Sequence, residues 1–199
     1  MIGIINYGLG NINAYYNIFK EHDINLKILS NYKDINSNID KLILPGIGSF
    51  DNAINLLKSQ KFFDEIINFS LNEKNKILGV CVGMQILSTT SQEGNLQGLD
   101  IIKESFHKLP SKILPHIGWN SVNINREIDI LNNINENTFF YFLHSYALLS
   151  KNSDLKICET MYETKFISVF QKKNIYGIQF HPEKSHSQGS QILLNFYKS

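Results

Sequence analysis

Short apolar runs alternate with amphipathic stretches through the first half of the chain. Four runs are apolar along most of their length, which is typical of strands covered on both faces: residues 2–7, 26–29, 41–44 and 77–80. Between them, apolar side chains recur three and four residues apart, which predicts helices at residues 12–19, 50–57 and 62–67 and another from Gly83. Strands that alternate with helices predict an α/β fold, with a mainly parallel, twisted sheet flanked by helices.

The second half has a different pattern, because strand-like runs follow one another with only turn residues between them. These runs are residues 121–124, 139–143, 155–160, 166–170 and 175–180. Consecutive strands predict antiparallel strands added to the sheet in the C-terminal half. A closing helix is expected from about Gln188 to Lys198. No repeat, linker-like tract or charge block interrupts the chain, so we expect residues 1–199 to form a single domain.

Composition and charge narrow the class of protein. The chain has 199 residues, 43% of them hydrophobic, and can therefore bury a full-sized core. Its 19 basic and 18 acidic residues nearly cancel, whereas a nucleic-acid-binding protein normally carries a basic excess on one face. The most apolar stretch, residues 139–149, is interrupted by His144 and Ser145 and is too short to span a bilayer. These features predict no nucleic-acid partner and no membrane span.

The cysteines and the N-terminus indicate the compartment. Cys81 and Cys158 are too few for a disulfide framework and fit a reducing environment. No basic leader precedes the apolar run at residues 2–5, which argues against a secretory signal. We therefore expect a cytoplasmic protein. The histidines share no short ligand spacing, so no metal site is expected, and His144 is interpreted as a core residue.

The strongest local signal is a buried strand that runs into Gly-x-Cys-x-Gly and then into a predicted helix. This is the thiol version of a nucleophile elbow, in which a sharp turn presents the nucleophile above the sheet. Gly79 and Gly83 fit this reading because side chains there would collide across the turn. A helix N-terminus behind Cys81 favours the thiolate. The alternative is a buried structural cysteine, but the flanking glycines favour a nucleophile.

A second signal is the sequence His181-Pro182-Glu183. In an extended segment these two side chains point to the same side, and Pro182 biases His181 toward that conformation. An imidazole beside a carboxylate is the arrangement of base and orienting group in a catalytic triad. Taken alone, the motif is equally compatible with a surface turn. Together with the cysteine elbow, it predicts a triad of Cys81, His181 and Glu183.

A third signal is the glycine loop that follows the strand at residues 41–44. Glycines at the carboxyl end of a strand let backbone N–H groups face a ligand, as an oxyanion site requires. A phosphate loop is the rival, but no Gly-Lys-Ser/Thr follows Gly48. The glycines near residue 8 do not form a dinucleotide fingerprint either, because Asn13 stands where the third glycine belongs. We therefore expect an oxyanion loop and no nucleotide cofactor.

Taken together, these segments resemble the triad class of glutamine amidotransferases. The two signature segments are GVCVGMQ at residues 79–85 and QFHPEKS at residues 179–185. Within that class the chain is similar to the glutaminase subunits of imidazole glycerol phosphate synthase. Four further segments carry this resemblance: NYGLGN at 6–11, LPGIGSF at 44–50, PHIGWN at 115–120 and FLHSY at 142–146. The resemblance spans nearly the whole chain.

The resemblance implies hydrolysis of L-glutamine, with ammonia passed to a barrel-shaped cyclase subunit in a heterodimer and with no cofactor. It implies that Cys81 attacks the amide, that His181 moves the protons and that Glu183 orients the imidazole. The further roles that it implies are backbone oxyanion donors at Gly46, Ile47 and Val82, substrate contacts at Gly48, Gln85, Ser145 and Tyr146, and a partner interface at Asn11, Trp119 and Lys184.

Three departures from the family pattern bear on the ammonia acceptor. The chain has Asn13-Ala14 where arginine and serine are usual, Ala147 where a second aromatic residue is common, and an atypical stretch at 98–114. These positions leave the triad intact but affect the partner-facing side. A paralogous glutaminase that supplies ammonia for amidination of a surface sugar is therefore an alternative. A non-catalytic module is disfavoured because the triad is complete, and a different cysteine hydrolase is disfavoured by Gln85 and residues 145–146.

Overall fold

A seven-stranded sheet forms the centre of the molecule. The computed structural model describes residues 1–125, 127–136, 138–151 and 154–199. The strand order is β10-β11-β12-β4-β3-β1-β2. The parallel strands are β1 (Ile2–Ile5), β2 (Lys27–Leu29), β3 (Lys41–Leu44), β4 (Lys76–Val80) and β12 (Ile175–Ile178). The antiparallel strands β10 (Lys156–Tyr162) and β11 (Thr164–Lys172) complete it. The predicted α/β fold with a mainly parallel sheet is confirmed.

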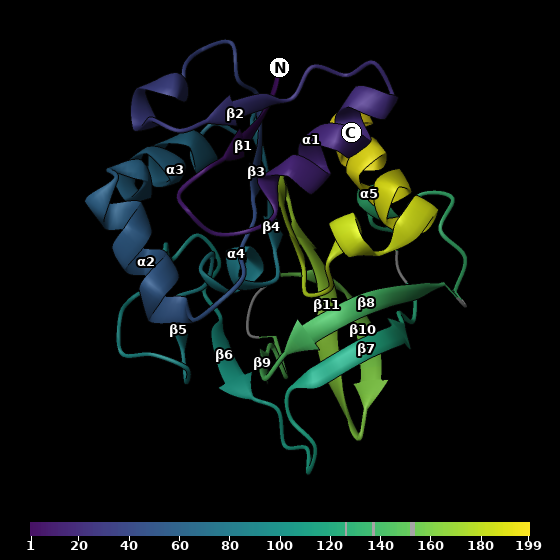
Figure 1. Cartoon of the computed structure of the whole chain (residues 1–199). Coiled ribbons are helices and arrows are strands. Elements are labelled where there is room, and N and C mark those ends of the chain that lie inside the picture. The colour runs from purple at the N-terminus through teal and green to yellow at the C-terminus, as the bar shows by residue number, and fades with distance from the viewer. Residues whose placement is uncertain (126, 137, 152–153) are drawn as a thin grey trace.

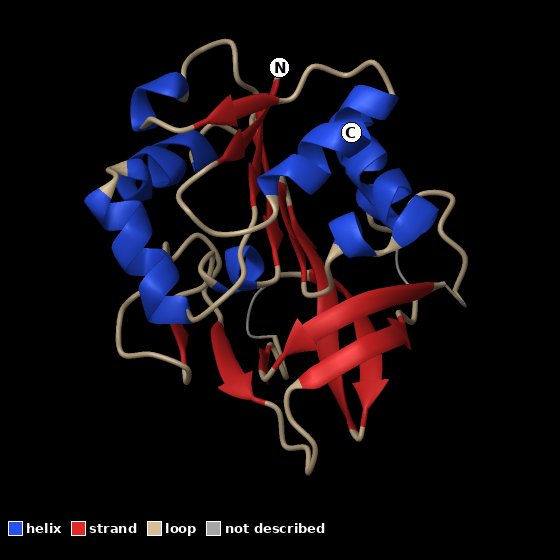
Figure 2. Ribbon diagram, in the orientation of Figure 1, coloured by secondary structure: helices blue, strands red, loops and turns tan. Residues whose placement is uncertain are grey.

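Helices cover both faces of this sheet. They are α1 (Ile12–Glu21), α2 (Phe50–Ser59), α3 (Phe62–Ser70), α4 (Val82–Gln85) and α5 (His186–Lys198), with short 3₁₀ helices η1 (Tyr32–Asp34), η2 (Asp129–Leu131) and η3 (Pro182–Lys184). Figures 1 and 2 show α2 and α3 on one side of the strands and α1 and α5 on the other. Each long helix buries one apolar stripe, as Ala53, Ile54 and Leu57 do in α2. This burial joins the layers into one core.

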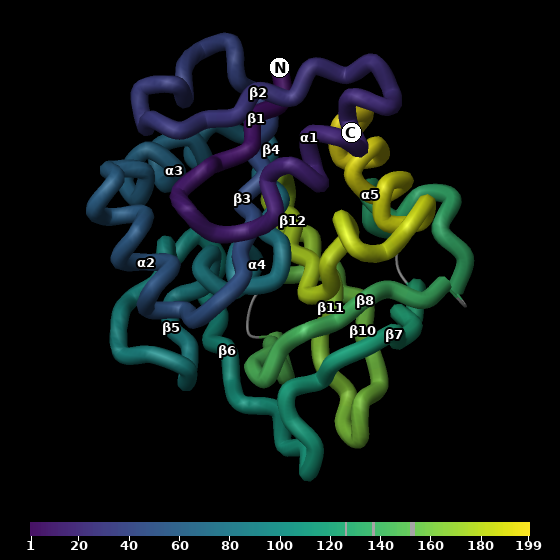
Figure 3. The backbone as a smooth tube through the Cα atoms, in the orientation of Figure 1, coloured from purple at the N-terminus to yellow at the C-terminus, as the bar shows by residue number. Residues whose placement is uncertain are grey.

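Two smaller sheets lie at the opposite end of the molecule from the chain termini (Figure 3). One contains β5 (Thr90–Ser91), β6 (Ser105–Lys108) and β9 (Tyr146–Ala147), and the other pairs β7 (His116–Ser121) with β8 (Phe139–His144) in an antiparallel ribbon. Among the described residues, no helix combines the length and the apolarity that a membrane crossing needs.

The C-terminal half differs from the prediction in two ways. The strand expected at residues 121–124 lies instead at residues 116–121, because its pairing with β8 runs from His116 to Ser121. Residues 122–124 contribute only an isolated bridge, between Asn123 and Glu159. In addition, not all the late strands are antiparallel additions to the main sheet: β12 is parallel to β4, and β8 belongs to the separate ribbon. Long-range pairing therefore overrides the local turn pattern.

The sheet brings three distant segments to one edge. Strands β3, β4 and β12 are parallel neighbours, with Leu44 opposite Gly79 and Ile178 opposite Val80. Their carboxyl ends therefore lie side by side, which places the glycine loop, Cys81 and the segment that leads to His181 together. In open α/β sheets ligands bind beyond this edge of the strands.

Candidate active site

Cys81 lies at a sharp turn between β4 and α4. Its backbone has φ 53° and ψ −112°, a conformation that residues other than glycine rarely adopt. Its N–H donates to the Ile178 carbonyl at 2.8 Å. The flanking glycines are required by close packing. A Cβ on Gly83 would lie 1.8 Å from the Leu44 oxygen, and one on Gly79 would lie 2.5 Å from the Gly83 oxygen. The elbow geometry expected from the sequence is therefore present.

His181 and Glu183 form a buried hydrogen-bonded pair. His181 Nδ1 lies 2.9 Å from Glu183 Oε1, and the two side chains are 1% and 2% exposed. The local geometry differs from the prediction, because residues 182–184 form the 3₁₀ helix η3 rather than an extended segment. Only His181 itself is extended, with φ −99° and ψ 98°, as its position before proline predicts. The side chains thus meet across a tight turn.

The electrostatics of this pair depend on the thiol. Burial alone would lower the pKa of His181, but its interactions with Cys81 and with the Glu183 carboxylate outweigh burial and raise that pKa to about 10. Burial raises the pKa of Glu183, but its hydrogen bond to His181 and the charge of the imidazolium bring it below the usual value. His181 Nε2 is buried and has no hydrogen-bond partner among the described residues. It is therefore free to exchange a proton with a group in the pocket.

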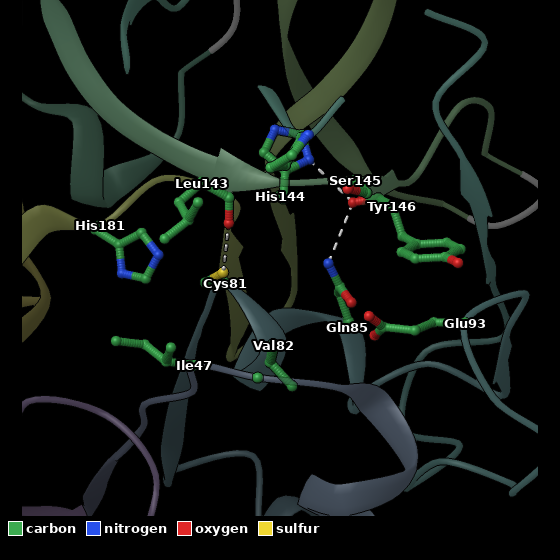
Figure 4. A pocket seen from close by; sticks show the side chains of 12 residues that line it. Ile47, Cys81, Val82, Gln85, Glu93, Leu143, His144, Ser145, Tyr146 and His181 are labelled. Atoms are coloured by element: carbon green, nitrogen blue, oxygen red, sulfur yellow. Dashed lines mark hydrogen bonds between the residues drawn. The ribbon is translucent and has the colours of Figure 1, made fainter. Parts of the chain in front are cut away.

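A pocket of about 200 Å³ opens beside the elbow (Figure 4). This volume is below the range of roughly 300–1,000 Å³ that drug-sized ligands occupy, so the pocket suits a small molecule. Its lining residues are Ile47, Gly48, Cys81, Val82, Gln85, Glu93, Pro115, Leu143, His144, Ser145, Tyr146 and His181. Two of the residues predicted to be catalytic, Cys81 and His181, line this one space together with every predicted substrate contact.

The orientation of Gln85 leaves an acceptor free in the pocket. Its Nε2 donates to the Tyr146 carbonyl at 3.2 Å and lies 3.4 Å from Gln179 Oε1. Its Oε1 is buried and has no hydrogen-bond partner among the described residues. The Glu93 carboxylate lines the same end of the pocket, and Figure 4 shows both side chains there. Together they present oxygen atoms to a positively charged group.

Glu93 was not predicted from the sequence to be a site residue. Its Oε2 accepts from the Phe50 N–H at 2.8 Å, and burial raises its pKa. It lies in a polar loop after β5, where no spacing or motif separates it from surface carboxylates. Its approach to the pocket depends on a contact with the start of α2, more than forty residues earlier in the chain.

Two buried histidines support the same end of the pocket. His116 Nδ1 lies 3.1 Å from His144 Nε2, and His144 Nδ1 lies 3.0 Å from the Tyr146 oxygen. Burial lowers the pKa of His116 to about 4 and that of His144 to about 3, so both rings are neutral at pH 7. Because the Tyr146 backbone carbonyl can only accept, the neutral His144 ring must donate from Nδ1 and accept at Nε2. The core assignment of His144 is therefore right, although its ring also borders the pocket.

The glycine loop packs directly on the elbow. A Cβ on Gly46 would lie 2.7 Å from the Gly83 nitrogen, so this backbone approaches α4 as closely as a glycine allows. Tyr7 donates its hydroxyl proton to the Pro45 oxygen at 2.7 Å and anchors the start of the loop. Gly48 has φ +118°. Ile47 and Val82 line the pocket together with Cys81.

The residues predicted to face a partner are exposed, and two of them lie together. Trp119 is 45% exposed, so it is not a core residue. Trp119 stacks on His186 at 5.0 Å and lies against Tyr141, while Lys184 Nζ lies 5.5 Å from the Tyr141 ring centre. Asn11 is exposed and also caps α1, since its side chain accepts from the Ala14 N–H.

Comparison with known proteins places this chain in a family. The family described as glutamine amidotransferase class-I matches residues 3–199. Imidazole glycerol phosphate synthase subunit HisH 2 of Methanococcus maripaludis is 40% identical, over 100% of this chain and 99% of that protein. Subunit HisH of Leptospira borgpetersenii is also 40% identical, over 98% of each chain.

Solved structures show the same fold. A glutamine amidotransferase crystal structure aligns with a TM-score of 0.78 over 100% of this chain and 98% of the other, at 12% identity. The structure of PurLQS from Thermotoga maritima aligns with a TM-score of 0.74 over 99% and 97% of the two chains, at 15% identity. At these identities the likeness concerns the fold alone, whereas the family match rests on sequence. The chain belongs to the class-I glutamine amidotransferase family, as the resemblance predicted.

Proposed function

We propose that this protein is the glutaminase subunit of imidazole glycerol phosphate synthase in histidine biosynthesis. It hydrolyses L-glutamine to glutamate and ammonia, and it passes the ammonia to a cyclase subunit. The observation that carries the proposal is the pocket in which an elbow cysteine meets a buried His–Glu pair. The HisH subunits of Methanococcus maripaludis and Leptospira borgpetersenii, each 40% identical to this chain over nearly its whole length, support the choice of pathway.

The triad chemistry follows from the geometry. The Cys81 thiolate attacks the side-chain amide carbon of glutamine, and His181 protonates the departing nitrogen as the C–N bond breaks and the thioester forms. His181 then takes a proton from water, whose oxygen attacks the thioester carbon; the C–S bond breaks and releases glutamate and the Cys81 thiolate, with the proton left on His181 for the next cycle. Glu183 holds the Nδ1 proton, so that Nε2 faces the reacting atoms.

The tetrahedral intermediates need donors for their negative oxygen. The backbone N–H of Val82 and those of the loop at Gly46 and Ile47 are the candidates, since both segments border Cys81. The peptide between Gly46 and Ile47 can reorient at low cost and switch between a donating and a non-donating state. One missing donor costs roughly 10²- to 10³-fold in rate, which is enough to gate hydrolysis without any change in the triad.

The end of the pocket that Gln85 and Glu93 line binds the α-amino and α-carboxylate groups of glutamine. The free Oε1 of Gln85 and the Glu93 carboxylate accept hydrogen bonds from the α-ammonium group of glutamine. The small residues Gly48 and Ser145, together with Tyr146, form the remaining wall around the substrate. A buried acceptor pair that requires an ammonium group selects an amino acid over a simple amide, because an analogue without it leaves both acceptors unpaired.

The partner-facing surface consists of Asn11, Trp119 and Lys184, and its partner is the barrel-shaped cyclase of a cytoplasmic heterodimer. The exposed Trp119 suits an interface core, where aromatic residues are enriched, and Lys184 suits the polar rim around it. A docked, substrate-loaded cyclase would switch the loop at Gly46 and Ile47, so that ammonia is released only when it can be used.

Replacement of the nucleophile tests the proposed reaction. Cys81→Ala should lower glutamine hydrolysis by at least about 10³-fold while the protein still folds, because the alanine keeps the elbow backbone. An electrophilic glutamine analogue should label Cys81 and spare Cys158, which is buried on β10 away from the pocket. Near-normal hydrolysis by Cys81→Ala, or labelling at Cys158 instead, would contradict the assignment.

A further inference from the structure

A tyrosine of α1 reaches the catalytic carboxylate from the opposite end of the sequence. Tyr15 is 1% exposed, and its hydroxyl donates to Glu183 Oε2 at 2.9 Å. The other carboxylate oxygen, Oε1, lies 2.9 Å from His181 Nδ1. Both oxygens of the buried carboxylate are therefore held, one by the catalytic imidazole and the other by a residue 168 positions away.

This second hydrogen bond matters because of how Glu183 is placed. Glu183 lies in η3, so its side chain must turn back toward a histidine only two residues earlier. A carboxylate bound at one oxygen can rotate about its terminal torsion, which has broad preferences. The Tyr15 hydroxyl removes this freedom and helps to bring the pKa of Glu183 below its usual value. Burial raises the pKa of Tyr15 well above its usual value, and so does the Glu183 charge, so the hydroxyl stays protonated as a donor.

We infer that Tyr15 is a positioning residue of the triad: it fixes the Glu183 carboxylate so that Oε1 holds His181 in its catalytic orientation. This inference rests on the proposed glutaminase function for its kinetic consequences. Tyr15 is not among the residues that line the pocket. It acts on the reaction only through Glu183.

A purely structural role for the tyrosine makes a different prediction. In that case the buried ring would matter and the hydroxyl would not, so Tyr15→Phe would leave catalysis unchanged. The chain offers a matched control in Tyr176, which is also 1% exposed and donates its hydroxyl to a carboxylate, Asp129 Oδ2, at 3.0 Å. Tyr176 lies outside the pocket lining, so Tyr176→Phe removes a buried hydroxyl–carboxylate hydrogen bond, together with the one that the hydroxyl accepts from Gln171 Nε2 at 3.2 Å, without touching the triad.

The test measures glutamine hydrolysis by the complex of this chain with its cyclase. Tyr15→Phe should lower kcat by about 10-fold, at the lower end of the losses seen when a supporting partner of a functional side chain is removed. KM for glutamine should change by less than about twofold, since the substrate contacts are intact. The acid limb of the pH profile should move to higher pH, because Glu183 loses a donor that stabilises its charge. Tyr176→Phe should change none of these values.

A double-mutant cycle shows whether the hydroxyl acts through the carboxylate. In a Glu183→Gln background, Tyr15→Phe should cause little further loss of kcat. A kcat of Tyr15→Phe within about twofold of the wild type, an equal loss in Tyr176→Phe, or a fully additive loss in the double variant would each overturn the inference.

A spectroscopic readout separates this inference from the proposed function. The proton on His181 Nδ1 should give a downfield NMR signal that shifts in Tyr15→Phe and not in Tyr176→Phe. An unchanged signal in Tyr15→Phe would overturn the role of Tyr15 even if the complex is active. A wild-type complex that releases no ammonia would instead contradict the proposed function, while the signal would still decide the role of Tyr15.

Discussion

The strained backbone at Cys81 predicts that glycine is tolerated there better than alanine. The residue has φ 53° and ψ −112°, and strain of this kind at functional sites costs of order 1–3 kcal/mol. Cys81→Ala keeps this strain, whereas Cys81→Gly relieves it. Both variants lack the thiol and should be inactive, so a difference in their stability reports on the backbone alone.

The expected difference in stability between Cys81→Gly and Cys81→Ala follows from three contributions. Relief of strain stabilises Cys81→Gly relative to Cys81→Ala by about 2 kcal/mol. Against this, glycine costs about 0.7 kcal/mol through the entropy of the unfolded chain, and loss of the buried methyl group costs up to about 0.8 kcal/mol. Cys81→Gly should therefore be more stable than Cys81→Ala by about 0.5 kcal/mol.

Cys158 provides the matched control. It is buried on β10 and is not among the residues with positive φ, so only the two unfavourable contributions apply there. Cys158→Gly should be less stable than Cys158→Ala by about 1.5 kcal/mol. The two sites should thus differ by about 2 kcal/mol, measured by urea unfolding at 25 °C. If glycine is worse than alanine by the same amount at both sites, the elbow stores no strain and the reasoning is wrong.

Two further predictions concern the titrating groups of the site. His181→Ala should abolish hydrolysis as completely as loss of the nucleophile. Glu183→Gln should retain roughly 10- to 100-fold more activity than His181→Ala, because the amide can still form a hydrogen bond with the imidazole. Equal losses in a steady-state assay would show that Glu183 does more than orient the ring. Burial lowers the pKa of His116 to about 4 and that of His144 to about 3. Below pH 6.5 these two rings therefore take up protons in the unfolded chain, whereas in the folded protein they stay neutral. The free energy of unfolding, measured in urea, should therefore fall as the pH is lowered from 6.5 to 4, by up to about 2.7 kcal/mol per pH unit for the two rings together. The fall should be smaller in His116→Asn. A free energy of unfolding that does not change with pH in this window would contradict the buried neutral pair.

The sequence was most informative where chemistry and backbone geometry are local. The elbow at Cys81 could be predicted because Gly-x-Cys-x-Gly after a buried strand is a local motif. Of its two glycines, only Gly79 is required by a contact within a few residues, whereas Gly83 is required by its approach to Leu44 at the end of β3. The pairing of His181 with Glu183 was predicted correctly, but from an extended geometry that the structure replaces with η3. The pair survives this difference because two side chains at such short spacing can meet in either conformation.

The supporting contacts could not be predicted, because they join distant parts of the chain. Tyr15 meets Glu183 across 168 positions, and His116 meets His144 only because β7 pairs with β8. Glu93 reaches the pocket through a contact with the start of α2. Each of these residues looks ordinary in sequence: an apolar helix position, a core histidine and a loop carboxylate. Their placement depends on sheet topology, which periodicity alone does not determine.

The central claim is that this chain produces ammonia for a histidine-pathway cyclase. The most direct measurement mixes the purified chain with that cyclase and its nucleotide substrate, supplies glutamine labelled with ¹⁵N at the side-chain amide, and follows the label. We expect very slow hydrolysis by the chain alone, strong stimulation by the loaded cyclase, and ¹⁵N in the imidazole product. Cys81→Ala should abolish both the stimulated hydrolysis and the transfer of the label. Full turnover by the isolated chain would contradict the gate, and stimulation only by a sugar-amidinating partner would assign the ammonia to a different acceptor.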